Sequence, residues 1–167
     1  RDRRVCVAGG GNSALQEAML LADTCAHVTI LQDLKDLTGE ARMQEMIRMR
    51  ENVSVRTGVR IDGLLSQNGS LTGVRIQDPE GKAETIACDA LFEAIGLIPE
   101  NEAFRELVSL TPQGYFDAGE DCRTQSEGLF VAGDCRRKTV RQLTTAVADG
   151  ATAALAACDY LRNHWHE

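Results

Sequence analysis

The segment that most constrains the fold is a glycine-rich stretch near the start of the sequence. Residues 5–8 are apolar and typical of a buried strand, three glycines follow, and a helical pattern begins directly afterwards. Gly9 permits a tight turn out of the strand, and Gly11 lacks the Cβ that would block the approach of a pyrophosphate. Ala14 is small enough for the helix to pack on the strand. The stretch therefore fits the dinucleotide-binding pattern G-x-G-x-x-A.

The surroundings of this stretch favour the same interpretation. Asn12 or Ser13 is expected to cap the following helix, whose free N–H groups and positive dipole end attract a phosphate. The helix, over residues 14–24, has one apolar face, and a second apolar strand over 27–31 follows where a βαβ unit needs one. Three consecutive glycines are also compatible with a plain loop, but the order strand, loop, helix and strand indicates nucleotide binding.

The end of the second strand is expected to select the nucleotide. An acidic residue about 20 residues beyond the glycines accepts hydrogen bonds from the adenosine ribose, whereas an arginine accommodates a 2′-phosphate. Here Gln32 and Asp33 open a tip, residues 32–36, that holds two acids and one lysine. NADH is therefore favoured over NADPH. The alternative is that Asp33 only caps the next turn.

The next part of the chain predicts the remaining elements of an α/β domain. A helix is expected over 40–51, with a methionine-rich face packed in the core, and a short parallel strand over 53–56. Residues 59–88 alternate between apolar and polar and contain two turn sequences, which predicts a three-stranded antiparallel meander. Residues 89–95 predict another buried strand. The expected fold class is α/β, a Rossmann-like three-layer domain with a β-meander.

The last third of the sequence has a different character. A short helix or turn is expected over 101–108, and short strands over 114–117 and 128–134. Residues 141–161 predict a long, alanine-rich helix, whose small side chains suit close packing against another element.

Composition and charge exclude several classes of partner. The net charge of −7 disfavours nucleic acid and anionic membrane surfaces. No apolar run has the length of a transmembrane helix, and no signal peptide opens the chain, so a cytoplasmic location is expected. With 167 residues, the chain is long enough for one ordinary domain, or for one small domain and a piece of another.

The six cysteines indicate neither a metal site nor a redox pair. They are scattered, none forms a C-x-x-C, and no histidine lies at ligand spacing. We expect most of them to be small, buried and reduced, with Cys135 the one that could lie near a cofactor. No residue is assigned as catalytic or as a metal ligand.

Four motifs occur in an order typical of one enzyme family. They are the glycine loop 9–14, the segment 94–99, the segment 128–134, and Arg141-Gln142 with Asp149-Gly150. Together they resemble the low-molecular-weight thioredoxin reductases, which are FAD-dependent pyridine nucleotide-disulfide oxidoreductases. The resemblance implies a pyridine-nucleotide domain over 1–97, followed at 98–167 by the C-terminal part of a discontinuous FAD-binding domain.

The resemblance also implies positions for both cofactors. Ile95 and Gly96 would lie near the nicotinamide, and Asp134 would bind the ribityl or pyrophosphate region of FAD. The segment Arg141, Gln142 and Leu143 would run along the flavin ring at a helix N-terminus, where backbone N–H groups stabilise negative charge. The alternatives are a turn acid for Asp134 and an exposed helix-start residue for Arg141.

Two departures from the family pattern affect the expected function. The sequence has no N-terminal FAD segment and no C-x-x-C, so it is expected to be a fragment that is inactive alone. At 32–34 it has Gln-Asp-Leu where NADPH-using members resemble one another in a His-Arg-Arg. The intact protein would pass hydride from NADH or NADPH to FAD and on to a disulfide.

The resemblance implies a thioredoxin-like protein disulfide or a peroxiredoxin as partner, and a homodimer when intact. The NADH-dependent flavoprotein of alkyl hydroperoxide reductase is the alternative enzyme. A dinucleotide-binding module without its own chemistry is the alternative outside the enzymes.

Overall fold

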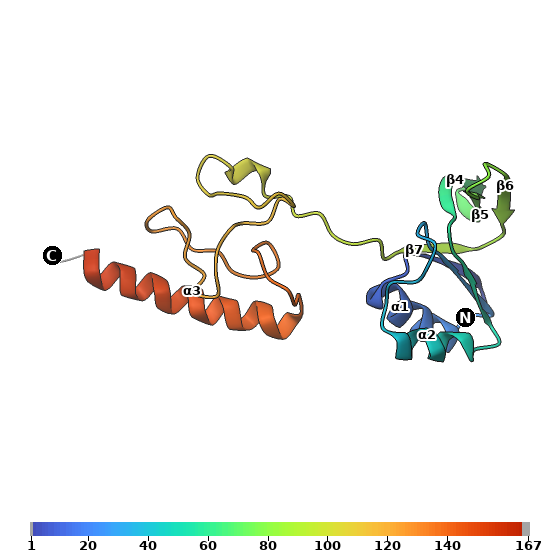
Figure 1. Ribbon diagram of the computed structural model, residues 1–167, viewed down its shortest axis with the longest axis horizontal. Helices are drawn as coiled ribbons and strands as arrows, with labels where there is room; N and C mark the ends of the chain where they lie inside the picture. Colours follow the sequence, from blue (N-terminus) through green and yellow to red (C-terminus); the bar gives the residue numbers. More distant parts are fainter. Residues whose placement is uncertain (1, 165–167) are drawn as a thin grey trace. The chain divides into compact units, whose positions relative to one another are not determined.

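The computed structural model describes residues 2–164 and divides into two compact units, Arg1–Gly96 and Leu97–Glu167 (Figure 1). The first unit, coloured blue to green, contains both sheets and two helices. The second contains one short 3-10 helix and one long α-helix joined by irregular chain.

The first unit is organised around a parallel sheet with the strand order β3-β2-β1-β7. Its strands are β1 (Arg4–Ala8), β2 (His27–Leu31), β3 (Val53–Arg56) and β7 (Ala90–Glu93). Every neighbouring pair is parallel. The chain therefore moves from β1 outward to β2 and β3, and then returns to the other side of β1. The predicted parallel strands are confirmed.

Alternation along the strands explains why the sheet is covered on both faces. Val5 and Val7 pack with residues of α1 (Asn12–Ala22) and α2 (Ala41–Arg48). Cys6 belongs instead to a cluster with residues of the second sheet. Because successive strand residues point to opposite faces, β1 serves both clusters, and three layers result.

The second sheet is the predicted meander. It consists of β4 (Arg60–Gln67), β5 (Ser70–Gln77) and β6 (Ala83–Ile86), all antiparallel. It connects β3 to β7, in the place of a crossover helix. Arg56 and Glu84 form a bidentate ion pair that joins the ends of the two sheets. Its two nitrogen–oxygen distances are 3.2 and 2.6 Å.

The helix α2 corrects one expectation. It ends at Arg48, so the predicted methionine face is mostly outside the core: Met46 and Met49 are exposed, and only Met43 packs partly against the buried cluster. Ile47 is the one buried residue of the helix. An eight-residue helix has about two turns and offers little more than one buried position to the sheet.

The second unit contains η1 (Glu102–Phe104), α3 (Leu143–His164) and a small core around Val108, Phe116 and Val131. The predicted helix is confirmed. The strands predicted at 114–117 and 128–134 are wrong, because only isolated bridges form there: Phe116 pairs with Leu110 and Arg136, and Phe130 pairs with Arg123. A strand needs a continuous neighbour, and none is present in residues 97–164.

All six cysteines are free thiols. Cys6, Cys88 and Cys122 are buried, Cys25 and Cys135 are half-buried, and Cys158 is exposed. The expectation of mostly buried cysteines therefore holds for half of them. Within residues 2–164, no helix combines the length and the apolar character that a membrane span requires.

Candidate functional site

The first unit contains an open cavity of about 610 Å³ at the carboxyl ends of its parallel strands. In open α/β sheets, ligands bind at this edge, where neighbouring connections leave in opposite directions. That position is the end of β1, which lies between β2 and β7. Eight of the predicted cofactor residues line the cavity: Gly9, Gly11, Asn12, Ser13, Gln32, Asp33, Ile95 and Gly96.

Gly9 is required where β1 runs into the loop. Its φ is +122°, a conformation that residues with a side chain rarely adopt. A Cβ at this position would lie 2.3 Å from the carbonyl oxygen of Ala94 and 3.4 Å from the Cβ of Ala14. Ala14 is itself fully buried beneath the loop. Gly9 therefore lets β1, β7 and α1 converge at the cavity.

Gly11 has a different role, because it faces open space. A Cβ there would meet only the Thr38 hydroxyl, at 3.7 Å. Gly11 is also the N-cap of α1, with no side-chain cap hydrogen bond, and the first intrahelical bond is donated by the Leu15 N–H to the Gly11 carbonyl. The N–H groups of the first turn are therefore left for a ligand.

The expected capping role of Asn12 or Ser13 is wrong, because the helix already begins at Asn12. The Asn12 side chain instead pairs with Glu40: its Oδ1 accepts from the Glu40 N–H at 2.7 Å, and its Nδ2 donates to the Glu40 carboxylate at 3.2 Å. The N–H groups of Thr38 and Gly39 both donate to the Gly10 carbonyl, at 2.8 and 2.9 Å. These bonds fasten the segment after β2 to the glycine loop.

Gln32 and Asp33 lie at the same cavity but differ in exposure. Gln32 is buried, and its side chain lies so close to Gly10 that a Cβ on Gly10 would approach it to 2.7 Å. Asp33 is exposed and forms no ion pair with any residue of the described chain. Gln32 thus supports the loop, whereas the Asp33 carboxylate is available to a ligand.

The four remaining predicted residues lie in the second unit. The Arg141 Nε donates to the Asp134 carbonyl at 3.2 Å, and the guanidinium lies 3.8 Å from the centre of the Tyr115 ring. Gln142 and Leu143 follow at the start of α3, and both are exposed. The Gln142 N–H already donates to the Thr145 hydroxyl, at 3.1 Å, so it is not free for another acceptor.

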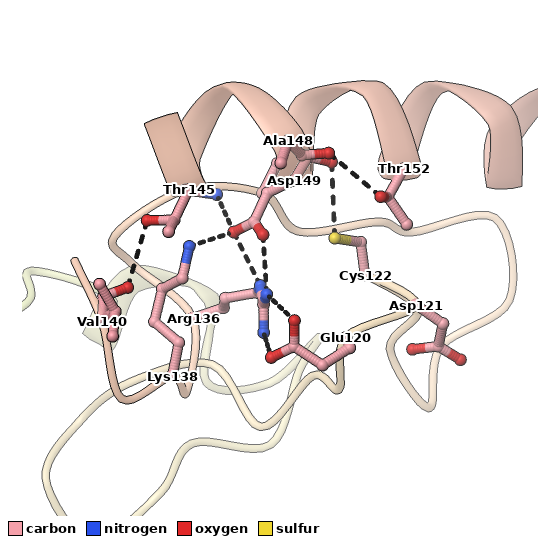
Figure 2. A network of polar contacts seen from close by, with 12 residues as sticks. Glu120, Asp121, Cys122, Arg136, Lys138, Val140, Thr145, Ala148, Asp149 and Thr152 are labelled. Atoms are coloured by element: carbon pink, nitrogen blue, oxygen red, sulfur yellow. Dashed lines mark hydrogen bonds and ion pairs between the residues drawn. The ribbon is translucent and has the colours of Figure 1, made fainter. Parts of the chain in front are cut away.

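A buried network of charged side chains, which was not predicted from the sequence, holds the segment 133–138 against α3 (Figure 2). The Asp149 carboxylate accepts from the Arg136 Nε and Nη2 at 2.8 and 2.7 Å, and from the Lys138 Nζ at 2.7 Å. It also accepts from the Gly133 N–H at 3.0 Å. On its other side Arg136 donates to the exposed carboxylate of Glu120, at 3.2 and 3.1 Å.

The network is almost completely removed from solvent. The side chains of Arg136, Lys138 and Asp149 are 1%, 5% and 7% exposed. Hydrogen bonds from Arg136 and then Lys138 hold the pKa of Asp149 well below its ordinary value, although burial opposes them. The bonds to Asp149 likewise raise the pKa of Arg136. Asp149 and Arg136 are therefore charged at neutral pH. Through its bond from the Gly133 N–H, the Asp149 carboxylate fixes the backbone next to Asp134.

One sequence signal for this network was present. Asp149 is one of two acids in an alanine-rich helix and the one nearer its start, and Arg136, Arg137 and Lys138 form a basic run just before that helix. The pattern does not say which two of the three cations turn inward to Asp149. That choice depends on the loop path: Arg137 pairs with the exposed Asp117 instead.

Comparisons of this chain with family models and with known proteins all indicate the same family. The model of the pyridine nucleotide-disulphide oxidoreductase family matches residues 1–150. The chain is 34% identical over 161 residues to a thioredoxin reductase from Mycoplasma genitalium, covering 95% of this chain and 51% of the relative. It is 33% identical over 162 residues to the F component of alkyl hydroperoxide reductase from Pseudomonas putida, covering 96% and 31%.

A solved structure supports the same assignment. The thioredoxin reductase of Lactococcus lactis matches with a TM-score of 0.86 at 28% identity, over 98% of this chain and 54% of that one. The α/β fold class and the family resemblance predicted from the sequence are confirmed. The chain spans between about a third and a half of the length of the curated relatives named above. It belongs to the pyridine nucleotide-disulphide oxidoreductase family.

Proposed function

We propose that residues 1–96 bind a pyridine dinucleotide, with NADH preferred over NADPH. The observation that carries the proposal is the single cavity that gathers the glycine loop, Asp33 and Ile95. The uncapped first turn of α1 suits a pyrophosphate, and the space in front of Gly11 leaves room for it. Asp33 would accept hydrogen bonds from the adenosine ribose, and its negative charge disfavours a 2′-phosphate.

The second unit is proposed to be the C-terminal part of an FAD-binding domain. Asp134 and Leu143 are exposed and available to a ligand, and the Arg141 side chain is held by Tyr115 and the Asp134 carbonyl. Because the Gln142 N–H is already bonded to Thr145, the flavin would be met by the N–H groups beyond it. FAD supplies the acceptor for hydride when it is bound. The residues of this chain would bind the flavin and orient it.

The intact protein is proposed to be a flavoprotein reductase that acts on a disulfide. The relatives named above are thioredoxin reductases and a component of alkyl hydroperoxide reductase, which supports a thioredoxin-like protein or a peroxiredoxin as the acceptor. A homodimer is proposed by the same analogy.

Titrating the purified chain with NADH and with NADPH, by calorimetry, tests the nucleotide proposal. We expect NADH to bind in the micromolar to millimolar range and NADPH at least about fivefold more weakly, as one like-charge contact predicts. Binding of neither nucleotide by chain that gives a folded circular dichroism spectrum would contradict the proposal.

Replacing Asp33 with arginine is expected to reverse this preference. The change removes a carboxylate that repels the 2′-phosphate and adds a guanidinium that binds it, so the ratio of NADH to NADPH affinities should change by tenfold or more. Asp36→Arg is the matched control, because it makes the same charge change three residues further on and outside the cavity lining. Equal shifts in the two variants would show a general charge effect and reject the assignment of Asp33.

A further inference from the structure

One cation lies beside Asp33 although the tip 32–36 does not contain it. Arg60 is the first residue of β4, and the segment before it is hydrogen-bonded to the tip on both sides of Asp33. The Gly58 N–H donates to the Leu34 carbonyl at 2.8 Å, and the Val59 N–H donates to the Gln32 carbonyl at 3.0 Å. These bonds fix the start of the meander alongside the residue proposed to bind ribose.

Asp33 and Arg60 together line two further cavities. The first, of about 330 Å³, borders the glycine loop at Gly9 and is mainly apolar, with Leu31, Val59 and Leu91 among its walls. The second, of about 400 Å³, extends from Asp33 and Arg60 towards Asp78. Asp33 also lines the nucleotide cavity, so all three spaces meet at this residue.

The charges around Arg60 favour a neutral ring over a second phosphate. In the first of these cavities, Asp33 and Glu93 accompany Arg60, and in the second Asp33 and Asp78 accompany it. Each therefore has two carboxylates for one guanidinium. An added dianion would be opposed, whereas a flat uncharged ring loses nothing to these carboxylates.

The guanidinium of Arg60 is available for such a ring. Arg60 is exposed, and its one side-chain hydrogen bond within the described chain goes from Nη2 to the Gln77 Oε1, at 3.3 Å. It takes part in no ion pair with residues 2–164. A planar guanidinium held at one end stacks on aromatic faces.

We propose that Arg60 is a specificity-determining residue that stacks on the adenine ring of the dinucleotide. The inference rests on the proposed function, since it requires the ribose to be bound at Asp33. The adenine then extends from the ribose into the two adjoining cavities that Asp33 and Arg60 both line. Arg60 recognises the base and is indifferent to the 2′ position.

The test compares ligands that contain or lack the adenosine end. Arg60→Ala is expected to weaken ADP-ribose and NADH by about the same factor, five- to tenfold, and to leave nicotinamide mononucleotide unchanged. Arg60→Lys is expected to match the alanine variant, because an ammonium lacks the planar face. Arg48→Ala, on the exposed side of α2, is the control and should bind all three ligands as the parent chain does.

The outcomes separate this inference from the function on which it rests. If the parent chain binds NADH but Arg60→Ala binds ADP-ribose within twofold of it, the assignment of Arg60 is wrong. If Arg60→Lys keeps the parent affinity, charge and not stacking is responsible, and the proposal is also overturned. Failure of the parent chain itself to bind NADH would instead reject the dinucleotide site.

Discussion

Replacing Gly9 with alanine is expected to weaken NADH binding at least tenfold. The new Cβ would lie 2.3 Å from the Ala94 carbonyl oxygen, and alanine would have to adopt a φ of +122°. Such a backbone conformation costs on the order of 1–3 kcal/mol, before the overlap is relieved. Because the overlapping atom belongs to the backbone, relief must separate β1 from β7 at the cavity. Calorimetric titration with NADH measures the loss of affinity.

Two other glycines serve as comparisons for this change, and the second of them is the control. Gly11→Ala places its Cβ in open space, so its cost to stability is limited to that of alanine at a helix N-cap, about 1 kcal/mol, while it weakens NADH binding by obstructing the pyrophosphate. Gly150→Ala lies within α3 with no atom near its Cβ, and should preserve NADH affinity. Unchanged NADH affinity in Gly9→Ala would mean that the loop does not set the geometry of the site.

Replacing Asp149 with asparagine is expected to destabilise the second unit by about 3–5 kcal/mol, which is the usual cost of breaking a buried ion pair. The substitution keeps the size of the side chain but leaves Arg136 and Lys138 buried without their counter-charge. Because the chain has two units, a single unfolding free energy is not a defined quantity, and hydrogen exchange resolved along the sequence is the suitable measurement. Amides of α3 should lose protection, while those of β1 and β2 should not.

Asp159→Asn is the control on the same helix. Asp159 pairs with Arg162 three residues later, and both side chains are largely exposed. Exposed pairs of this kind contribute less than about 1 kcal/mol, so protection of α3 should change little. Equal losses in the two variants would show that Asp149 has no special contribution to this unit.

The same network sets the behaviour of the second unit in acid. The pKa of Asp149 is lowered in the folded state, chiefly by its hydrogen bonds from Arg136, from an ordinary value of 3.8. A lowered carboxyl pKa contributes stability that is complete above the unfolded value and is lost as the pH falls below it. Protection of α3 should therefore decline below about pH 4 in the parent chain. The Asp149→Asn variant should lack this part of the decline, and an identical acid profile in both chains would contradict the assignment.

Features that depend on local pattern were predictable from the sequence. The strands β1 and β2 match residues 5–8 and 27–31 closely, because a buried parallel strand is a short, mainly apolar run. The half-buried β3 also matches residues 53–56. The glycine loop was predictable because Gly9 and Gly11 each have a physical reason to be glycine. The structure shows a positive φ at Gly9 and open space for a ligand in front of Gly11.

Features that depend on distant parts of the chain were not predictable. The pattern at 128–134 is that of a strand, but strand formation requires a neighbour, which no local pattern specifies. The Asp149 network joins side chains from three separate segments. Arg60 and Asp33 line the same cavities because backbone bonds from Gly58 and Val59 fix the start of the meander against the tip. The cap of α1, predicted at Asn12 or Ser13, lies at Gly11, and the Asn12 side chain is bonded instead to Glu40 from a later segment.

The buried thiols have a consequence for a protein proposed to work beside disulfides. Burial is the main cause that raises the pKa of Cys88, Cys122 and Cys135, and it raises that of Cys6 to about 12. Only the thiolate attacks a disulfide, so at neutral pH these sulfurs are almost wholly unreactive. A disulfide that approaches this chain is therefore not trapped by these four thiols as a mixed disulfide, and the exposed Cys158 is not one of them. The sulfur atoms of the core act as small apolar groups, and the packing that buries them also protects them from oxidation.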